Sequence, residues 1–176
     1  MKLLVESGML AVLIMIAGWF FVFKNSRALA RQSEINTLAA AMEKTLHEIS
    51  DENYKFWKDI SEDKDEHLAK CKLFSSYVEY RCNIIEKKVS LLHEKSKNCI
   101  NPAVINSKFV EESINLIAKI RDRSTINSEN LDNLSDKYLR ISVINNLTLK
   151  LTTTISSFVA IRFQPMSEWK WPENYY

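Results

Sequence analysis

Residues Leu3–Phe23 read LLVESGMLAVLIMIAGWFFVF, and from Ser7 to Phe23 this segment contains no charged residue. Twenty-one residues of α-helix are about 31 Å long, which matches the thickness of a bilayer's hydrocarbon core. A soluble domain of this size has no way to cover so long an apolar run. The segment therefore predicts one transmembrane helix, within residues 1–24.

A cleaved signal peptide is the alternative interpretation, because Ala28-Leu29-Ala30 has the small-x-small form of a cleavage site. Three features argue against cleavage. The only positive side chain before the apolar run is Lys2, the run is longer than a typical signal core, and Lys24 and Arg27 stand where a cleavage region is usually neutral. The pattern favours a helix that stays in the membrane.

Charge predicts the orientation of this helix. Lys24, Arg27 and Arg31 follow it, whereas Lys2 precedes it together with the acidic Glu6. Positive side chains are retained on the cytoplasmic side of a membrane. We therefore expect the N-terminus outside and residues 24–176 in the cytoplasm.

The rest of the chain has the composition of an all-α protein. Its two glycines, Gly8 and Gly18, both lie in the membrane segment, so the remaining residues cannot form many tight turns with positive φ. A phosphate-binding loop and a dinucleotide fingerprint both require glycines and are excluded. We expect a cytoplasmic helical bundle without a cofactor.

Charge and cysteine content narrow the function further. The net charge is +2, so no broad basic surface indicates direct nucleic-acid binding. The three cysteines, Cys71, Cys82 and Cys99, are widely spaced and odd in number, which is typical of a reducing compartment and not of a disulfide framework.

Apolar residues at steps of three and four predict the cytoplasmic helices. The first continues the membrane helix, over about residues 4–60; Asp63, with Glu66 three residues later, predicts the cap of the second, over about 65–95. Asn101 and Pro102 predict the start of a third, and residues 122–136 hold the longest loop. The expected domains are therefore residues 1–24, 25–161 and an extended aromatic tail, 162–176. The expected core residues are Ile35, Leu38, Ala39, Met42, Leu46, Ile49, Phe56 and Ile60, then Cys71, Phe74, Val78, Arg81 or Cys82, Ile85, Val89 and Leu92, then Ile105, Phe109, Ser113, Leu116, Ile117 and Ile120.

Residues 138–161 give conflicting signals. They are rich in β-branched side chains, which favour a strand. Leu147, Leu151, Ile155 and Phe158 nevertheless keep helical spacing, and a lone strand would have no partner in this chain. We predict a helix.

Small residues share one side of the membrane helix. Gly8, Ala11, Met15 and Gly18 are spaced by three and four, and small side chains let membrane helices approach closely. This face predicts self-association of copies of the chain. In a ring of copies, Glu6 would place carboxylates near the outer mouth of a pore, where they would attract cations.

No metal site or catalytic constellation is expected. His67 and Cys71 are four residues apart, but no third ligand is nearby, so we interpret them as a surface histidine beside a buried cysteine. The Arg-x4–6-His motif of HEPN ribonucleases, which are all-α, is absent: the nearest downstream pair is Arg81 and His93, twelve residues apart. Arg81-Cys82-Asn83 only loosely resembles the Arg-Asn start of that motif.

Together these features resemble a known family. The segment MKLLVESGMLAVLIMIAGWFFVF, the junction KNSRALARQSEI and the stretch from Arg81 to His93 are similar in layout to the small membrane accessory protein encoded beside the RNA-guided, RNA-cleaving effector of type VI-B CRISPR systems. The resemblance implies a ring-shaped homo-oligomer in the inner membrane that forms a pore, a degenerate HEPN-like domain at Arg81, Asn83 and His93, and enhanced antiviral defence through membrane depolarisation.

Two other functions are consistent with the residues. One is a membrane-anchored interaction protein that conducts nothing, such as a phage or plasmid exclusion or immunity protein. The other is a membrane-tethered enzyme, for which no constellation of residues argues.

Overall fold

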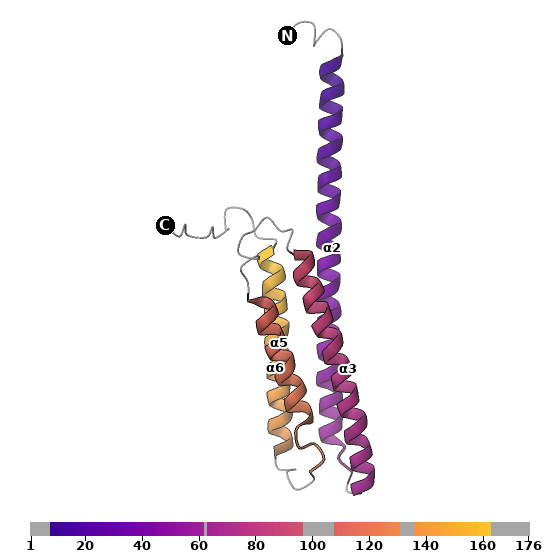
Figure 1. Ribbon diagram of the computed structural model, residues 1–176, viewed down its shortest axis with the longest axis vertical. Coiled ribbons are helices and arrows are strands. Elements are labelled where there is room, and N and C mark those ends of the chain that lie inside the picture. The colour runs from indigo at the N-terminus through magenta and orange to yellow at the C-terminus, as the bar shows by residue number, and fades with distance from the viewer. Residues whose placement is uncertain (1–7, 62, 97–107, 131–135, 163–176) are drawn as a thin grey trace, which may run out of the picture. The chain divides into compact units, whose positions relative to one another are not determined.

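The computed structural model describes residues 8–61, 63–96, 108–130 and 136–162 (Figure 1). Within these residues the regular structure consists of four α-helices and no strand, which confirms the all-α prediction. The helices are α2 (Met9–Lys58), α3 (Lys64–Ser96), α5 (Phe109–Thr125) and α6 (Lys137–Arg162). Glu6, Cys99, Pro102, Ile105 and the expected tail beyond Arg162 lie outside the described residues.

The start of α3 is capped as predicted, with one difference. The side-chain Oδ1 of Asp63 accepts hydrogen bonds from the backbone N–H groups of Asp65, at 2.9 Å, and Glu66, at 3.2 Å. The Glu66 carboxylate does not complete the reciprocal bond. It accepts from the Ser61 hydroxyl at 2.6 Å and pairs with Lys70 at 2.8 Å, so the first turn of α3 also holds Ser61, which follows α2.

The chain divides into two compact units, Met1–Thr37 and Leu38–Tyr176. The division falls within α2, later than the expected boundary at residue 24. In the first unit every described side chain from Gly8 to Arg31 is exposed. This part of α2 is long and apolar enough to cross a membrane.

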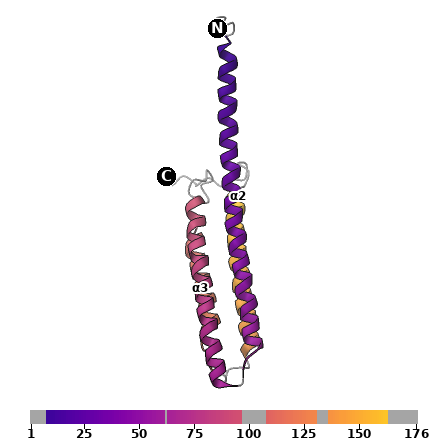
Figure 2. The same ribbon diagram turned by 90° about the vertical axis from the view of Figure 1, so that its right-hand side faces the viewer.

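The described residues of the second unit form an up-and-down bundle of four helices (Figures 1 and 2). Side-chain contacts join neighbouring helices around it. Arg81 of α3 pairs with Glu48 of α2 at 2.8 Å, and the Phe109 ring of α5 stacks on Phe158 of α6 at 4.0 Å. The Arg121 guanidinium of α5 pairs with the Glu86 carboxylate of α3 at 2.6 Å. The Ser156 hydroxyl of α6 donates to the Glu43 carboxylate of α2 at 2.9 Å, so contacts of this kind join each helix to both of its neighbours.

The core of the bundle follows the stripes that the sequence predicts, except that Leu38, which was expected in the core, is only half-buried. On α3, Cys82 and not Arg81 takes the central position, because the longer side chain reaches sideways to Glu48. Buried apolar side chains of the second unit are Ala39, Met42, Leu46, Ile49, Trp57, Cys71, Phe74, Val78, Cys82, Ile85, Val89, Leu92, Phe109, Leu116, Ile117, Ile120, Ile144, Leu151, Ile155 and Phe158.

The end of α2 differs from the prediction. Asn53 and Trp57 are buried there, whereas Phe56 and Ile60, which were expected in the core, are only half-buried. Residues 46, 49, 53 and 57 continue the helical spacing of the core stripe, so geometry places a polar amide inside the bundle. Neither Asn53 amide atom has a hydrogen-bond partner among the described residues.

The β-branched segment is a helix, as predicted. Ile144, Leu151, Ile155 and Phe158 are buried along one side of α6. The hydroxyls of Thr153 and Thr154 donate to the carbonyl oxygens of Leu149 and Lys150, four residues earlier. Packing against the other helices therefore outweighs the weak local preference for a strand.

Candidate functional site

The predicted membrane face consists of Gly8, Ala11, Met15 and Gly18, and all four residues are exposed. A Cβ atom built on Gly18 would meet nothing within 4 Å, so nothing in its own chain requires a glycine there. Gly8 has a second reason to be glycine, because its φ of +70° is one that L side chains rarely adopt. Its carbonyl oxygen accepts the first bond of α2, from Val12.

Aromatic rings and cations mark one end of the apolar segment. The Lys24 ammonium lies 5.2 Å from the centre of the Phe20 ring, and the Arg27 guanidinium lies 5.4 Å from that of Phe23. Beside them, Trp19 and Phe20 help to line a hollow of about 450 Å³ whose lining is wholly apolar. This arrangement is typical of a helix end at a membrane interface.

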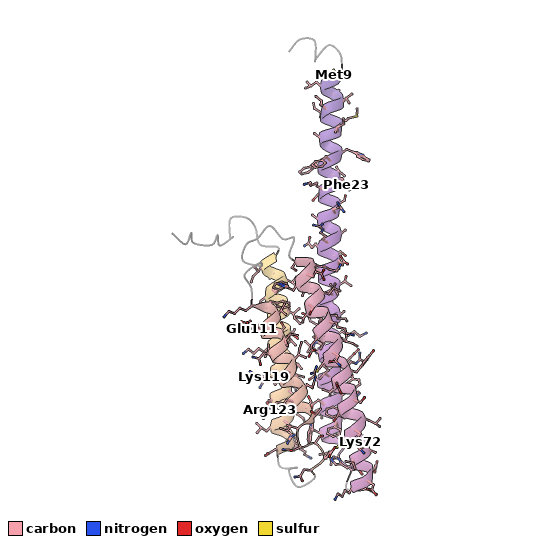
Figure 3. The ribbon with its side chains drawn as sticks, viewed as in Figure 1. Met9, Phe23, Lys72, Glu111, Lys119 and Arg123 are labelled. Carbon is pink, nitrogen blue, oxygen red and sulfur yellow. The ribbon has the colours of Figure 1, made fainter. Side chains whose placement is uncertain are left out.

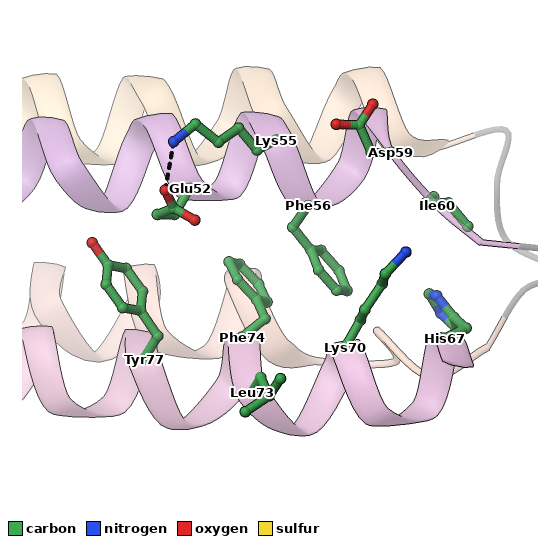
Figure 4. A pocket seen from close by; sticks show the side chains of 10 residues that line it. All are labelled: Glu52, Lys55, Phe56, Asp59, Ile60, His67, Lys70, Leu73, Phe74 and Tyr77. Carbon is green, nitrogen blue, oxygen red and sulfur yellow. Dashed lines mark hydrogen bonds and ion pairs between the residues drawn. The ribbon is translucent and has the colours of Figure 1, made fainter. Parts of the chain in front are cut away.

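Figure 3 shows the side chains of the described residues on the ribbon. A groove of about 490 Å³ opens between the end of α2 and the start of α3 (Figure 4). We call it the α2–α3 groove. The rings of Phe56 and Phe74 form its floor, stacked with centroids 4.2 Å apart and planes at 5°. Leu73 and Tyr77 line it from α3, and Leu73 is 74% exposed.

The charged side chains of the α2–α3 groove are unevenly paired. Lys55 pairs with Glu52 at 2.6 Å, and this contact raises the pKa of Lys55 (Figure 4). Lys70 pairs with Glu66, whose carboxyl pKa is lowered mainly by that contact. The Asp59 carboxylate makes no ion pair or hydrogen bond with any described residue. The groove therefore presents one unbalanced negative charge.

His67 also lines the groove. The expectation that it is a surface residue is wrong. It is only 2% exposed, because its Nε2 donates a hydrogen bond of 2.8 Å to the carbonyl oxygen of Ser128. The Nδ1 atom of the ring has no hydrogen-bond partner among the described residues. Cys71 Sγ donates to the same carbonyl at 3.1 Å.

Both described cysteines are buried, as predicted. Burial raises the pKa of the Cys71 thiol, and it raises that of Cys82 to about 11. A thiol with a raised pKa is a poor nucleophile at neutral pH, so the His67–Cys71 pair has the chemistry of a core contact.

The structure does not bring Arg81, Asn83 and His93 together. Arg81 and His93 lie twelve residues apart on α3, which separates them by about 18 Å along its axis. Arg81 is paired with Glu48, and the side-chain amide oxygen of Asn83 accepts a hydrogen bond of 3.1 Å from the Arg121 guanidinium. The His93 ring packs against Phe158, with centroids 6.5 Å apart.

Sequence reasoning did not find the α2–α3 groove. The sequence feature that marks the groove is a pair of large apolar side chains beside the core stripe of α3, Leu73 and Tyr77. Among the described residues there is also no cluster of three or more His, Cys, Asp or Glu side chains arranged for a metal ion.

Comparison of the chain with protein-family models, with curated proteins and with solved structures finds no match.

Proposed function

We propose that this protein is a single-pass inner-membrane protein whose copies associate side by side into a ring, and that the ring encloses an ion-conducting pore. One observation carries the proposal: the described side chains from Gly8 to Phe23 are all exposed and none is charged. Such a surface is stable in a bilayer or against another copy, and not in water.

The membrane face gives a reason for the copies to associate. Ala11, Met15 and Gly18 fall within one side of α2, and open space surrounds Gly18. Copies inserted with the same orientation associate in parallel, and rotation about an axis along the membrane normal closes such an assembly. The cations Lys24, Arg27 and Arg31 support a cytoplasmic position for the bundle.

The role in defence rests on the resemblance in layout to the type VI-B accessory protein. In that role the ring depolarises the inner membrane when the RNA-guided effector has recognised phage RNA. The lipid bilayer and further copies of the chain are the direct partners, and the link to the effector is functional.

A non-conducting membrane anchor is the second candidate, and one observation favours it. The residues from Met9 to Phe23 offer no polar side chain except the Trp19 indole, and an apolar lumen expels water. In this alternative α2 holds the bundle at the membrane, where the bundle binds a partner protein.

Electrical recording separates the two candidates. Purified full-length protein is reconstituted into planar bilayers, and current is measured at stepped voltages with matched empty-detergent controls. Discrete current steps that disappear in a membrane-face variant such as Gly18→Leu support the pore. A protein that inserts and oligomerises but carries no current favours the non-conducting anchor. In cells, a potential-sensitive dye reports whether depolarisation requires the effector and its target RNA.

A further inference from the structure

The α2–α3 groove opens away from the other two helices of the bundle. Seen from the groove, α2 and α3 lie in front and α5 and α6 lie behind them (Figure 4). Its floor is the stacked pair Phe56 and Phe74, and its rim carries the unpaired Asp59 carboxylate. An occupant with apolar side chains next to one cation would match both features.

The start of α6 carries such a set of side chains. Tyr138 and Leu139 are adjacent, large and 74% and 64% exposed. The Lys137 ammonium lies 5.3 Å over the Tyr138 ring and makes no ion pair with a described residue. We call residues Lys137, Tyr138 and Leu139 the α6 knob. Exposed apolar side chains of this size, side by side, are typical of a contact surface.

The groove and the α6 knob lie at the same level of the bundle. The Arg140 guanidinium, one residue after the knob, lies 4.8 Å over the ring of Trp57, which neighbours Phe56. It also donates to the carbonyl oxygen of Ile126 at 2.6 Å. His67 in the groove bonds to Ser128, two residues further on. Knob and groove therefore belong to one end of the bundle but to different faces of it.

We propose that the α6 knob of one copy docks in the α2–α3 groove of the next copy. Leu139 and the Tyr138 ring cover Phe56 and Phe74, and Lys137 pairs with Asp59. The proposal rests on the self-association in the proposed function and names the contact that carries it within the bundle.

The geometry favours a second copy as the occupant. Rotation about an axis parallel to the bundle brings together residues at the same level, and the two surfaces are complementary in charge. Because the two surfaces differ, each copy can hold one neighbour with its knob and the other with its groove. A contact of this heterologous kind repeats around a ring until it closes.

The first test is the mass of the full chain in detergent, by light scattering with the detergent contribution subtracted. Leu139→Asp should shift the mass from a large multiple of 20.5 kDa towards the single chain. Leu149→Asp is the matched control, since Leu149 lies on the same helix, is also 64% exposed and is outside the knob. Circular dichroism confirms that both variants fold.

The charge pair is tested by reversal. Asp59→Lys and Lys137→Glu should each weaken association, by roughly tenfold, because like charges then face each other across the contact. The double variant should regain most of the loss. Such a recovery occurs only if the two side chains meet in the oligomer. A general effect of the substitutions on solubility would not produce it.

Cross-linking tests whether the knob of one copy contacts the groove of another copy. Leu73→Cys chains and tagged Leu139→Cys chains are co-expressed in a Cys99→Ser background and treated with a short bismaleimide. Products that join tagged to untagged chains support the contact. A wild-type oligomer whose mass is unaffected by Leu139→Asp, and whose copies do not cross-link, overturns this contact and leaves the proposed function standing. A monomeric wild-type protein overturns both.

Discussion

The Nε2 atom of His67 and the carbonyl oxygen of Ser128 lie 2.8 Å apart, and this bond ties the first turns of α3 to the segment that follows α5. The carbonyl also accepts the Cys71 thiol, so one backbone oxygen serves two buried side chains of α3. Ser128 itself is 2% exposed. One end of the bundle is therefore fastened by polar contacts inside the core, where hydrogen bonds are costly to lose.

Replacement of His67 tests this fastening. His67→Ala leaves the Ser128 carbonyl with the weak thiol donor alone and opens space beside Phe56, so we expect the free energy of unfolding to fall by about 2–3 kcal/mol. Denaturant unfolding of the full chain in a nonionic detergent, followed by circular dichroism, measures the change. His47→Ala, at an exposed position of α2, is the control and should change stability little. Equal effects of the two substitutions would contradict the structural role.

Burial of Cys82 predicts a dependence of stability on alkaline pH. Its thiol pKa is raised from 9.0 to about 11, so the folded protein holds this proton more tightly than the unfolded chain does. The associated stabilisation is present below the unfolded pKa and is lost as the pH rises towards the folded value. Between about pH 8 and pH 10, stability should therefore fall by about 1 kcal/mol more in the wild type than in Cys82→Ala. Melting curves at the two pH values, compared within each protein, measure the difference; parallel declines would argue against it.

Asn53 predicts a stabilising substitution. Its side chain is fully buried, and its amide has no partner among the described residues, so Asn53→Leu removes a desolvation cost while it keeps the branching at Cγ. We expect an increase in stability of about 1 kcal/mol, which raises the melting temperature by a few degrees. Thr45→Val is the comparison, because the Thr45 hydroxyl is bonded to Ala41 at 2.8 Å and its loss should be neutral or unfavourable. A large destabilisation by Asn53→Leu would mean that a bound water or a partner uses the amide.

The membrane face predicts the effect of added bulk in the membrane helix. Gly18→Leu places a large side chain on the face of Ala11 and Met15 and should weaken association of the copies while insertion stays intact. Ala17→Leu adds similar bulk on another side of α2 and is the matched control. Light scattering in detergent measures association, and carbonate extraction of membranes measures insertion. An unchanged mass for Gly18→Leu would count against close packing through this face.

The sequence was sufficient for the features that depend on local pattern. The apolar run to Phe23, with Lys24 and Arg27 after it, predicts a helix able to span a membrane, and the structure has an exposed helix of that length and composition. The near absence of glycine predicts an all-α fold, and the Asp63 cap predicts the start of α3 to within one residue. These features follow from spacing and from the chemistry of single residues, so they can be read without knowledge of what packs against them.

Tertiary packing decided the rest. Local pattern assigned His67 to the surface and Phe56 to the core, whereas in the structure His67 is buried and Phe56 lies at the floor of a groove. His67 is buried beside the Ser128 carbonyl, a hydrogen-bond partner sixty-one residues away in the chain. The α2–α3 groove likewise combines residues of two helices, which the pattern of either helix alone does not specify. The period of a helix determines which residues share a face, but only the arrangement of the helices determines which faces are buried. The groove and the knob are surfaces that this arrangement leaves exposed.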